Sequence, residues 1–515
     1  MNALTPQDFI AVIGAGAMGS GIAQVALDAG HRVALYDAAP AALERGIGAI
    51  DAAYRRLRDK GRIDAATHAA RMARLVRAGG VADLAGAALV IEAIVEDIDV
   101  KARVLAEVEA VLDDDAIVAT NTSSLSVTAL GARLRRPARV AGLHFFNPAP
   151  VLPLVEIVSG KATDPAVADT LFATARAWNK VPVRCASTPG FIVNRVARPF
   201  YGEALRLLAE RAADAATLDA ILRDCGGFRM GAFELMDMIG HDVNYAVTRS
   251  VYDALYQDPR YKPSLLQREL VDAGWLGRKS GRGFHRYGDD AARPAPVLAA
   301  PAPRPSAVVV EGDLGVAAPL ARLAADAGLA VRHVPGARAL LRVDGVALAL
   351  TDGRGATRRL AADPQDAAVV FDLAFDYAGA AVIAVAVADQ APAGALDAAV
   401  GFFQALGKQV AVVDDAPGLV VMRTVAMLAN EAADVVQQGI ASAADTDLAM
   451  TGGVNYPRGP LAWADLVGPA PLQRVLANLA AAYGEDRYRT SPLLLRRALA
   501  GQPFHAPAAA PERAA

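Results

Sequence analysis

A glycine-rich run near the start of the chain has the spacing of a phosphate-binding turn. The segment VIGAGAMGSG places Gly14, Gly16 and Gly19 in the pattern G-x-G-x-x-G, between an apolar run and a helical pattern. Glycines at these positions permit a tight turn and the close approach of a pyrophosphate, which the following helix N-terminus faces. Asp37 ends the next apolar run, where a carboxylate can bind a ribose 2′-hydroxyl and repels a 2′-phosphate. The pattern predicts a site that favours NAD over NADP, with an ordinary glycine turn as the alternative.

The elements that must position this site follow from the apolar periodicity. Strands are expected at 8–14, 31–37, 88–94, 116–121 and 140–144. A helix at 20–30 makes the opening a βαβ unit, so an α/β doubly wound parallel-sheet domain of the Rossmann type is expected over residues 1–187. Long helical periodicities from Gly190 onward then predict a separate all-helical domain at 188–288.

The chain also repeats itself. Setting residue n against residue n + 228 pairs Lys180 with Lys408, Gly190 with Gly418, Arg195 with Arg423, Glu203 with Glu431, Asp219 with Asp447, Asp237 with Asp465 and Gly240 with Gly468. An offset of 298 pairs Gly14 with Gly312, Gly30 with Gly328 and Val33 with Val331. A second, degenerate copy of both domains is therefore predicted. We expect an exposed, semi-rigid Pro/Ala linker at 289–306, a degenerate Rossmann-like domain at 307–414, a second helical domain at 415–502 and a disordered tail at 503–515.

The bulk composition argues against several classes of function. The chain has 52 basic and 55 acidic residues and a net charge of −3, so nothing global attracts nucleic acid or an anionic membrane. The two cysteines, Cys185 and Cys225, lack metal-like spacing, which predicts reduced thiols and no metal site. The apolar stretch from Tyr377 to Ala388 is too short to span a bilayer and predicts a buried strand, and the N-terminus lacks a signal-peptide pattern. A cytoplasmic protein without nucleic-acid or membrane partners is expected.

Three longer segments resemble the L-3-hydroxyacyl-CoA dehydrogenase family. They are NTSSLS at 121–126, GLHFFNPAPVLPLVEIV at 142–158 and TPGFIVNR at 188–195, and the resemblance covers about residues 8–287. It implies NAD-dependent oxidation of the 3-hydroxyl group of an acyl-coenzyme A thioester to the 3-oxo form. It also implies that the helical domain at 188–288 binds substrate and pairs subunits. The length beyond the first helical domain resembles bacterial long forms associated with phenylacetate breakdown, which implies 3-hydroxyadipyl-CoA as substrate. The motifs are equally compatible with 3-hydroxybutyryl-CoA.

His144 and Glu156 are the predicted acid–base pair. His144 lies at a predicted strand end, where a doubly wound sheet places its chemistry, and an imidazole is suited to take a hydroxyl proton as hydride departs. Glu156 stands in the apolar run LVEIV, where a carboxylate is costly unless partnered, and the resemblance implies His144 as that partner. Such a carboxylate favours the imidazolium and fixes its orientation. The alternatives are a structural histidine and a glutamate that faces water.

The resemblance assigns the remaining site residues. Ser123, after the strand ending ATNTS, and Asn194, inside the helical run GFIVNRVARPF, match the groups that hold the substrate oxygen and the nicotinamide. Local caps are the alternative for both. The positions that match the family's cofactor contacts are Glu96, Lys101, Asn147 and Lys279. A solvated surface charge is the alternative for Glu96 and Lys101.

A basic segment at 54–77 matches an insert that contributes to the family's coenzyme A site, whose phosphates need positive charge. Its basic residues are Arg55, Arg56, Arg58, Lys60, Arg62, Arg71, Arg74 and Arg77. A solvated helix face is the alternative, and the sequence does not single out which of them contact phosphate.

Two rival functions fit the fingerprint. One is dehydrogenation of a free hydroxy acid or sugar acid, as in crystallin-like relatives that share HFFNP-type segments, and the other is a non-catalytic dinucleotide-binding protein. The sequence leaves open the acyl-chain preference, the pathway and whether the acyl-CoA-binding chain forms a homo-oligomer.

The second copy lacks the chemistry of the first. Its equivalents of Gly16, Gly19 and Asp37 are Leu314, Ala317 and Pro335, and its equivalent of Asn194 is Met422. We predict that this copy has lost catalysis, and that its helical part packs on the first helical domain as a second subunit would.

Overall fold

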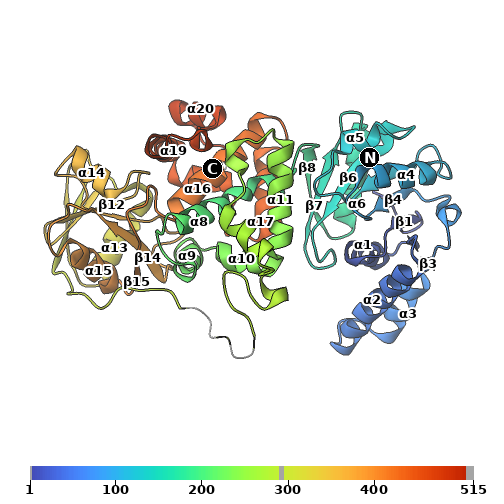
Figure 1. The fold of residues 1–515 in the computed structure, drawn as a ribbon, viewed down its shortest axis with the longest axis horizontal. Helices are drawn as coiled ribbons and strands as arrows, with labels where there is room; N and C mark the ends of the chain where they lie inside the picture. Colours follow the sequence, from blue (N-terminus) through green and yellow to red (C-terminus); the bar gives the residue numbers. More distant parts are fainter. Residues whose placement is uncertain (1–2, 289–290, 292–294, 506–515) are drawn as a thin grey trace, which may run out of the picture. The chain divides into compact units, whose positions relative to one another are not determined.

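The computed structural model describes residues 3–288, 291 and 295–505, and it consists of two compact units (Figure 1). The first unit contains the chain up to Arg195 together with Gln438–Val454, and the second contains Val196–Gln437 and the chain from Asn455. The first unit therefore includes a segment of the second copy, which the sequence does not predict. No helix in the described ranges is both long and apolar enough to cross a membrane.

The first unit is built on an eight-stranded sheet in the order β3-β2-β1-β4-β5-β6-β7-β8. Its strands are β1 (Ile10–Ile13), β2 (Val33–Tyr36), β3 (Leu75–Arg77), β4 (Leu89–Glu92), β5 (Ile117–Thr120), β6 (Val140–Phe145), β7 (Leu154–Ser159) and β8 (Val181–Ala186). β1 to β6 follow the order of the dinucleotide-binding doubly wound fold, whose ligand crevice opens between β1 and β4. The five predicted strands are confirmed. The sheet departs from an all-parallel one only where β6 and β7 run antiparallel.

Helices follow the strands as the periodicity predicts. They are α1 (Ala17–Asp28), α2 (Pro40–Asp59), α3 (Ala65–Ala73), α4 (Ile98–Glu109), α5 (Val127–Gly131) and α6 (Pro165–Ala177). Aspartates start three of them, since the carboxylates of Asp64, Asp97 and Asp164 accept first-turn amides of α3, α4 and α6. α2 and α3 form a pair that extends away from the sheet and carries most of the basic segment at 54–77 (Figure 1).

The second unit contains the first helical copy, a second sheet and most of the second helical copy. The first copy consists of α8 (Arg198–Ala209), α9 (Ala215–Ala220), a π-turn at Ile221–Cys225, α10 (Ala232–Ile239), α11 (His241–Ala254) and α12 (Leu265–Asp272). The second consists of α16 (Val421–Gln437), α18 (Pro460–Val467), α19 (Pro469–Tyr483) and α20 (Pro492–Ala500), and α17 (Ala443–Val454) belongs to the first unit. An offset of 228 carries the bounds of α10 onto those of α18, so the repeat is structural.

The second sheet has seven strands in the order β10-β9-β11-β12-β13-β14-β15. They are β9 (Ala307–Glu311), β10 (Ala330–Val334), β11 (Leu340–Val343), β12 (Val346–Leu350), β13 (Val369–Phe371), β14 (Val382–Val387) and β15 (Gln409–Val412). The register repeats that of the first sheet: the pair Ile10 and Val33 recurs as Val308 and Val331, and Leu154 with Val181 recurs as Val382 with Gln409. Antiparallel β11 makes this copy a mixed sheet. The buried strand predicted within 377–388 is β14.

The helical copies pack together in the second unit through reciprocal contacts. α8 packs on α16. Glu203 of α8 accepts hydrogen bonds from Arg423 Nε at 2.6 Å and from the Tyr488 hydroxyl at 2.9 Å. Glu431, its counterpart in α16, accepts from the hydroxyl of Tyr261. Tyr261 and Tyr488 end the matching short turns Pro259–Tyr261 and Asp486–Tyr488, where the offset of the repeat is 227. Equivalent residues thus exchange equivalent contacts, as in a two-fold interface. The predicted packing of one helical copy on the other is confirmed.

The segment after the first helical copy is largely exposed, with Val297 65% exposed, and it is hydrogen-bonded to the second sheet. The Ala299 amide donates to the Val410 carbonyl at 2.8 Å, and the Ala302 amide donates to Gln404 Oε1 at 2.9 Å. β15 is an edge strand of the second sheet, so this Pro/Ala segment covers an edge whose backbone groups would otherwise lack partners. The predicted linker is thus bonded to this edge, and its residues 289–290 and 292–294 lie outside the described residues.

The predicted tail begins too early. Phe504 and His505 donate backbone amides to the Asp465 carboxylate at 2.7 and 3.0 Å. In the first copy the equivalent carboxylate, Asp237, accepts the amides of residues 284–285 at 3.0 and 2.9 Å. Phe504 and His505 therefore complete the second helical copy. The rest of the predicted tail lies outside the described residues.

Candidate active site

The predicted acid–base pair meets across β6 and β7. The antiparallel register sets His144 opposite Glu156, and His144 Nδ1 lies 2.7 Å from Glu156 Oε2. The two side chains are only 7% and 1% exposed. Glu156 Oε1 accepts the backbone amides of Ile192 and Val193 at 3.1 and 3.0 Å. Both carboxylate oxygens are engaged, so the alternative of a glutamate that faces water is wrong.

This arrangement leaves the second ring nitrogen of His144 available. The ring contacts Phe146 and Phe191, with centroid distances of 4.6 and 5.7 Å. Because Nδ1 faces a carboxylate, it carries the proton of a neutral imidazole and Nε2 keeps its lone pair. Among the residues that the structure describes, none hydrogen-bonds Nε2. His144 is thus oriented on one side and open on the other, as a general base requires.

Glu96 organises the loop that carries Ser123. Its Oε1 accepts the Thr122 hydroxyl at 2.5 Å, the amides of Ser123 and Ser124 at 3.1 Å each, and the Ser124 hydroxyl at 2.9 Å. Burial opposes its ionisation, but the Thr122 hydrogen bond, the charge of Lys101 and the Ser124 hydrogen bond together lower the pKa of Glu96. The Ser123 hydroxyl has no partner in the described part of the chain. The Glu96 side chain is 37% exposed, but its carboxylate is bound to the Ser123 loop, and its cofactor contact stays a prediction.

Lys101 is not a surface charge. Its side chain is 1% exposed, and its ammonium lies 2.6 Å from Glu92 Oε1 and 3.2 Å from Glu96 Oε2. Glu92 is fully buried at the end of β4 and also accepts the Thr120 hydroxyl at 2.7 Å. Lys101 therefore joins the end of β4 to the carboxylate that holds the Ser123 loop. A solvated position is excluded for this lysine.

The glycine turn after β1 has the shape that a pyrophosphate needs. Gly14 has a φ of +96°, and a Cβ there would lie 2.5 Å from the Ala93 carbonyl oxygen. A Cβ on Gly19 would lie 1.8 Å from the Gly14 carbonyl oxygen, so only glycine permits this approach of α1 to the turn. Nothing lies within 4 Å of a Cβ on Gly16, and the N-terminus of α1 has no side-chain cap. The open, uncapped helix start fits an anion.

Asp37 stands at the end of β2 beside this turn. It is half-buried, and its oxygens accept the amides of Ala15 and Ala39 at 2.8 and 2.9 Å. A carboxylate keeps further acceptor capacity after two such bonds, so it can still receive ribose hydroxyls. The residues of the first unit fit a bound NAD.

The chain matches known protein families along most of its length. Residues 9–188 match the model "3-hydroxyacyl-CoA dehydrogenase, NAD binding domain", and residues 190–287 and 418–506 match "3-hydroxyacyl-CoA dehydrogenase, C-terminal domain". Residues 348–417 match "3-hydroxybutyryl-CoA dehydrogenase reduced Rossmann-fold domain". The chain belongs to the 3-hydroxyacyl-CoA dehydrogenase family. The predictions of family, fold class, NAD as cofactor and enzyme class are confirmed.

Individual relatives agree with this assignment. A 3-hydroxyadipyl-CoA dehydrogenase of Escherichia coli (strain K12) is 44% identical over 95% of this chain and 97% of that protein. A 3-hydroxybutyryl-CoA dehydrogenase of Clostridioides difficile is 37% identical over 54% of this chain and 99% of that protein. The crystal structure of a 3-hydroxybutyryl-CoA dehydrogenase from Escherichia coli K12 matches with a TM-score of 0.88 and 42% identity, over 97% of this chain and 99% of that one.

The remaining predicted site residues lie in different parts of this dehydrogenase. Asn194 is half-buried at the start of the short helix α7 (Val193–Val196), next to the amides that bind Glu156. Asn147 is exposed directly after β6. Lys279 belongs to the second unit, where its ammonium lies 2.6 Å from Asp242. The cofactor contacts assigned to Asn147 and Lys279 stay predictions.

The basic segment separates into paired and unpaired residues. Arg71 lies 2.9 Å from Asp28, Arg77 lies 2.6 Å from Glu44, and Arg55 pairs with Asp51. Arg56, Lys60 and Arg62 are exposed and have no carboxylate partner among the described residues. Only the unpaired residues have charge to offer a ligand without breaking an ion pair.

Several functional residues were not identified from the sequence. Thr122 and Ser124 shape the loop of Ser123 through Glu96, and Asn121 Oδ1 accepts the Phe145 amide at 2.8 Å, which ties the end of β5 to β6. Glu92 stands inside the apolar run LVIEAI, as Glu156 stands inside LVEIV. A carboxylate in such a run is costly unless it has a partner, and this could have identified Glu92.

The second copy has different residues at every position that is predicted to be catalytic. An offset of 228 places Asp372 at the position of His144 and Ala384 at that of Glu156, and the two are still opposed, since the Asp372 amide donates to the Ala384 carbonyl at 3.0 Å. Thr351 stands at the position of Ser123. Where the glycine turn and its crevice would lie, Arg354 and Asp352 form an ion pair at 2.6 Å. The copy keeps the strands and lacks the base.

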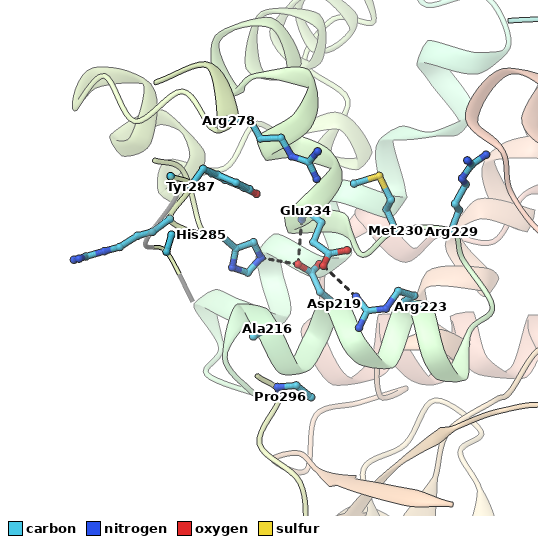
Figure 2. A pocket seen from close by; sticks show the side chains of 13 residues that line it. Ala216, Asp219, Arg223, Arg229, Met230, Glu234, Arg278, His285, Tyr287 and Pro296 are labelled. Carbon is cyan, nitrogen blue, oxygen red and sulfur yellow. Dashed lines mark hydrogen bonds and ion pairs between the residues drawn. The ribbon is translucent and has the colours of Figure 1, made fainter. Parts of the chain in front are cut away.

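A pocket of about 600 Å³ in the first helical copy contains none of the predicted site residues (Figure 2). Its charged side chains bind one another: Asp219 Oδ2 lies 2.8 Å from His285 Nε2, and Arg223 Nη1 lies 3.1 Å from Glu234 Oε1. Figure 2 shows these pairs at the base of the pocket, beneath Arg278. We assign it no part in the reaction.

Proposed function

We propose that this NAD-dependent 3-hydroxyacyl-CoA dehydrogenase uses His144 as its general base. The observation that carries the proposal is the 2.7 Å contact between His144 Nδ1 and Glu156, which leaves Nε2 free. In the oxidation Nε2 takes the proton of the C3 hydroxyl, and the charge that forms on the ring is stabilised by the buried carboxylate. Bound NAD supplies the hydride acceptor. In the reverse direction the imidazolium returns the proton.

The remaining residues bind and orient. Gly14, Gly16 and Gly19 admit the pyrophosphate at the start of α1, and Asp37 receives the ribose hydroxyls. Ser123, on the loop held by Glu96, has an unengaged hydroxyl beside the end of β5 that suits the thioester or substrate oxygen. Asn194, which follows the Val193 amide that binds Glu156, is proposed for the same task. The water-poor surroundings of the His144 ring strengthen these hydrogen bonds.

We propose 3-hydroxyadipyl-CoA as the preferred substrate. The Escherichia coli relative of that name is 44% identical over 95% of this chain. A solved structure named 3-hydroxybutyryl-CoA dehydrogenase matches over 97% at 42% identity, so that thioester is the competing substrate. The test is a substrate panel followed by the absorbance of reduced nicotinamide. It contains 3-hydroxyadipyl-CoA, 3-hydroxybutyryl-CoA and the corresponding free hydroxy acids. A higher kcat/KM for 3-hydroxybutyryl-CoA refutes the substrate, a preference for free acids refutes the thioester requirement, and no reduction with any of them refutes the enzyme.

For the coenzyme A phosphates we propose Arg56, Lys60 and Arg62, the exposed and unpaired residues of the basic segment. The double variant Lys60→Glu, Arg62→Glu should raise KM for the acyl-CoA several-fold and leave KM for NAD unchanged. Arg77→Gln is the matched control, because Arg77 is already paired with Glu44 at 2.6 Å. Equal KM values in the double variant and the control would refute this assignment.

The cellular setting is also a proposal. Both cysteines are buried free thiols, which suits the reducing cytoplasm, and burial raises their pKa values further. A homo-oligomer stays a prediction.

A further inference from the structure

We infer that Gly453, in α17 of the second copy, is a positioning residue for the His144–Glu156 pair of the first. The inference rests on the proposed role of that pair. α17 belongs to the first unit and packs on β7 and β8, the strand that carries Glu156 and its outer neighbour. A helix from the copy that has lost its own base thus lies behind the base of the other.

The contact at Gly453 is tight, and it involves residues that adjoin or bind the Glu156 carboxylate. A Cβ on Gly453 would lie 2.6 Å from Leu154 Cδ2 and 3.1 Å from Val193 Cγ2. Leu154 and Val193 are 0% and 2% exposed, so neither has solvent to move into. The Val193 amide donates to Glu156 Oε1 at 3.0 Å, and Leu154 stands two residues before Glu156 on β7. Displacing either side chain therefore moves the groups that hold Glu156.

The segment that carries α17 is anchored to the same region by its own hydrogen bonds. The Ala186 amide, at the end of β8, donates to the Ile440 carbonyl at 2.8 Å, and Arg195 Nη1 donates to Gln438 Oε1 at 2.9 Å. The chain that enters α17 is therefore tied to this region, and the helix itself packs on β7 and β8. An added side chain has to displace Leu154 or Val193, because the helix is held.

The second sheet contains the equivalent of this contact, with residues of different sizes. In the second unit the Asp414 amide donates to the Ala212 carbonyl at 2.9 Å, the counterpart of the bond between Ala186 and residue 440, so the docking is reciprocal. At the positions of Leu154 and Gly453 the second sheet has Val382 and Cys225, and the π-turn that contains Cys225 packs on β14. The larger strand residue, Leu154, is thus paired with glycine. The smaller one, Val382, corresponds to it in the copy where cysteine replaces the glycine.

The sizes of the residues at this contact suggest the experiment. Gly453→Ala should lower kcat with 3-hydroxyacyl-CoA roughly 10- to 100-fold, the order of loss for a misplacement of about 1 Å, with little change in KM for NAD. Gly452→Ala is the matched control on the same helix, because its Cβ would meet Leu154 at 3.7 Å, an ordinary contact. Adding Leu154→Val to Gly453→Ala should restore most of the lost kcat, since it removes the δ-carbons that the new methyl meets.

A general loss of structure would give a different result. If Gly453 acts through His144, Gly453→Ala should cause no further fall in the residual kcat of His144→Ala, whereas a damaged fold would lower it again. Should Gly453→Ala fail to fold, Leu154→Ala loosens the contact from the other side and should lower kcat without changing NAD affinity.

The inference is overturned if Gly453→Ala keeps a kcat within twofold of Gly452→Ala, if the second-site change does not rescue, or if the loss adds to that of His144→Ala. An unaffected Leu154→Ala overturns it as well. Failure of the proposed function itself is distinct, because it shows as normal turnover in His144→Ala.

Discussion

Replacing Glu156 with glutamine tests the orientation of the base with almost no change in volume. Glu156 accepts two backbone amides at 3.1 and 3.0 Å through one oxygen and faces His144 Nδ1 at 2.7 Å through the other. A glutamine can point its carbonyl oxygen at only one of these. Turning the amide nitrogen toward the two backbone donors leaves both of them unsatisfied, at about 1–3 kcal/mol each.

The glutamine carbonyl therefore faces the backbone amides, and its NH₂ donates to His144 Nδ1. The imidazole then carries its proton on Nε2, the nitrogen that must accept the substrate proton. A base locked in the wrong tautomer is the situation that costs a serine protease about 10⁴-fold in kcat when its orienting aspartate becomes asparagine. We expect Glu156→Gln to lower kcat by about 10³- to 10⁴-fold, which corresponds to about 4–5.5 kcal/mol of transition-state stabilisation.

The assay is steady-state oxidation of 3-hydroxyacyl-CoA, with NAD affinity measured separately by fluorescence titration. The cofactor turn lies at β1 and α1, so the dissociation constant of NAD should change by less than about threefold. The double variant with His144→Ala should be no slower than His144→Ala alone, because Glu156 acts through the ring. A kcat within tenfold of wild type, or losses that multiply in the double variant, would refute this reasoning.

Four further outcomes are expected. His144→Ala should lower turnover about 10²- to 10⁴-fold while NAD still binds, and near-normal turnover of the purified variant would contradict the assignment. Asp37 should make kcat/KM far higher with NAD than with NADP, and comparable values would count against its ribose contact. Calorimetric titration should give one NAD per chain, and two would show that the second copy has kept its site. Burial raises the pKa of Asp372 to about 6 from an ordinary value of 3.8, despite the backbone amides that it accepts. When the pKa of a carboxyl is raised in the folded protein, the free energy of unfolding falls as the pH rises through that pKa. Between pH 5 and 7.5 the free energy of unfolding of wild type should therefore fall by about 1.4 kcal/mol relative to that of Asp372→Asn. The measurement is the difference in Tm between the two proteins, which should shrink over this pH range.

Much of the first unit could be predicted because its chemistry is local in sequence. The glycine turn, Asp37 at the end of a strand and the twelve-residue spacing of His144 and Glu156 each combine a residue type with an element that fixes its direction. Glu96 could not be predicted in the same way. Its role as the acceptor for residues 122–124 depends on two loops 26 to 28 residues apart, and one sequence gives no measure of such pairing.

The docking of Gln438–Val454 on the first sheet could not be predicted for a different reason. An internal repeat shows which residues correspond, but it does not show whether a helix packs on its own sheet or on that of the other copy. Both choices bury the same faces. Residue sizes favour docking on the sheet of the other copy, since Gly453 lies against Leu154. That match can be recognised only once the two segments are known to be in contact.

The loss of chemistry in the second copy separates two tasks that Glu156 combines. In the first copy this carboxylate both orients His144 and binds the amides of Ile192 and Val193. In the second, Asp372 occupies the position of the histidine and accepts the corresponding amides of residues 420 and 421 at 2.9 and 2.7 Å. It also accepts the Met422 amide at 2.9 Å. The bonds that hold the helix start have been kept, and the base that the carboxylate would orient is gone. Selection for shape alone explains this pattern, because a buried helix start left without acceptors would destabilise α16, which packs on the first helical copy.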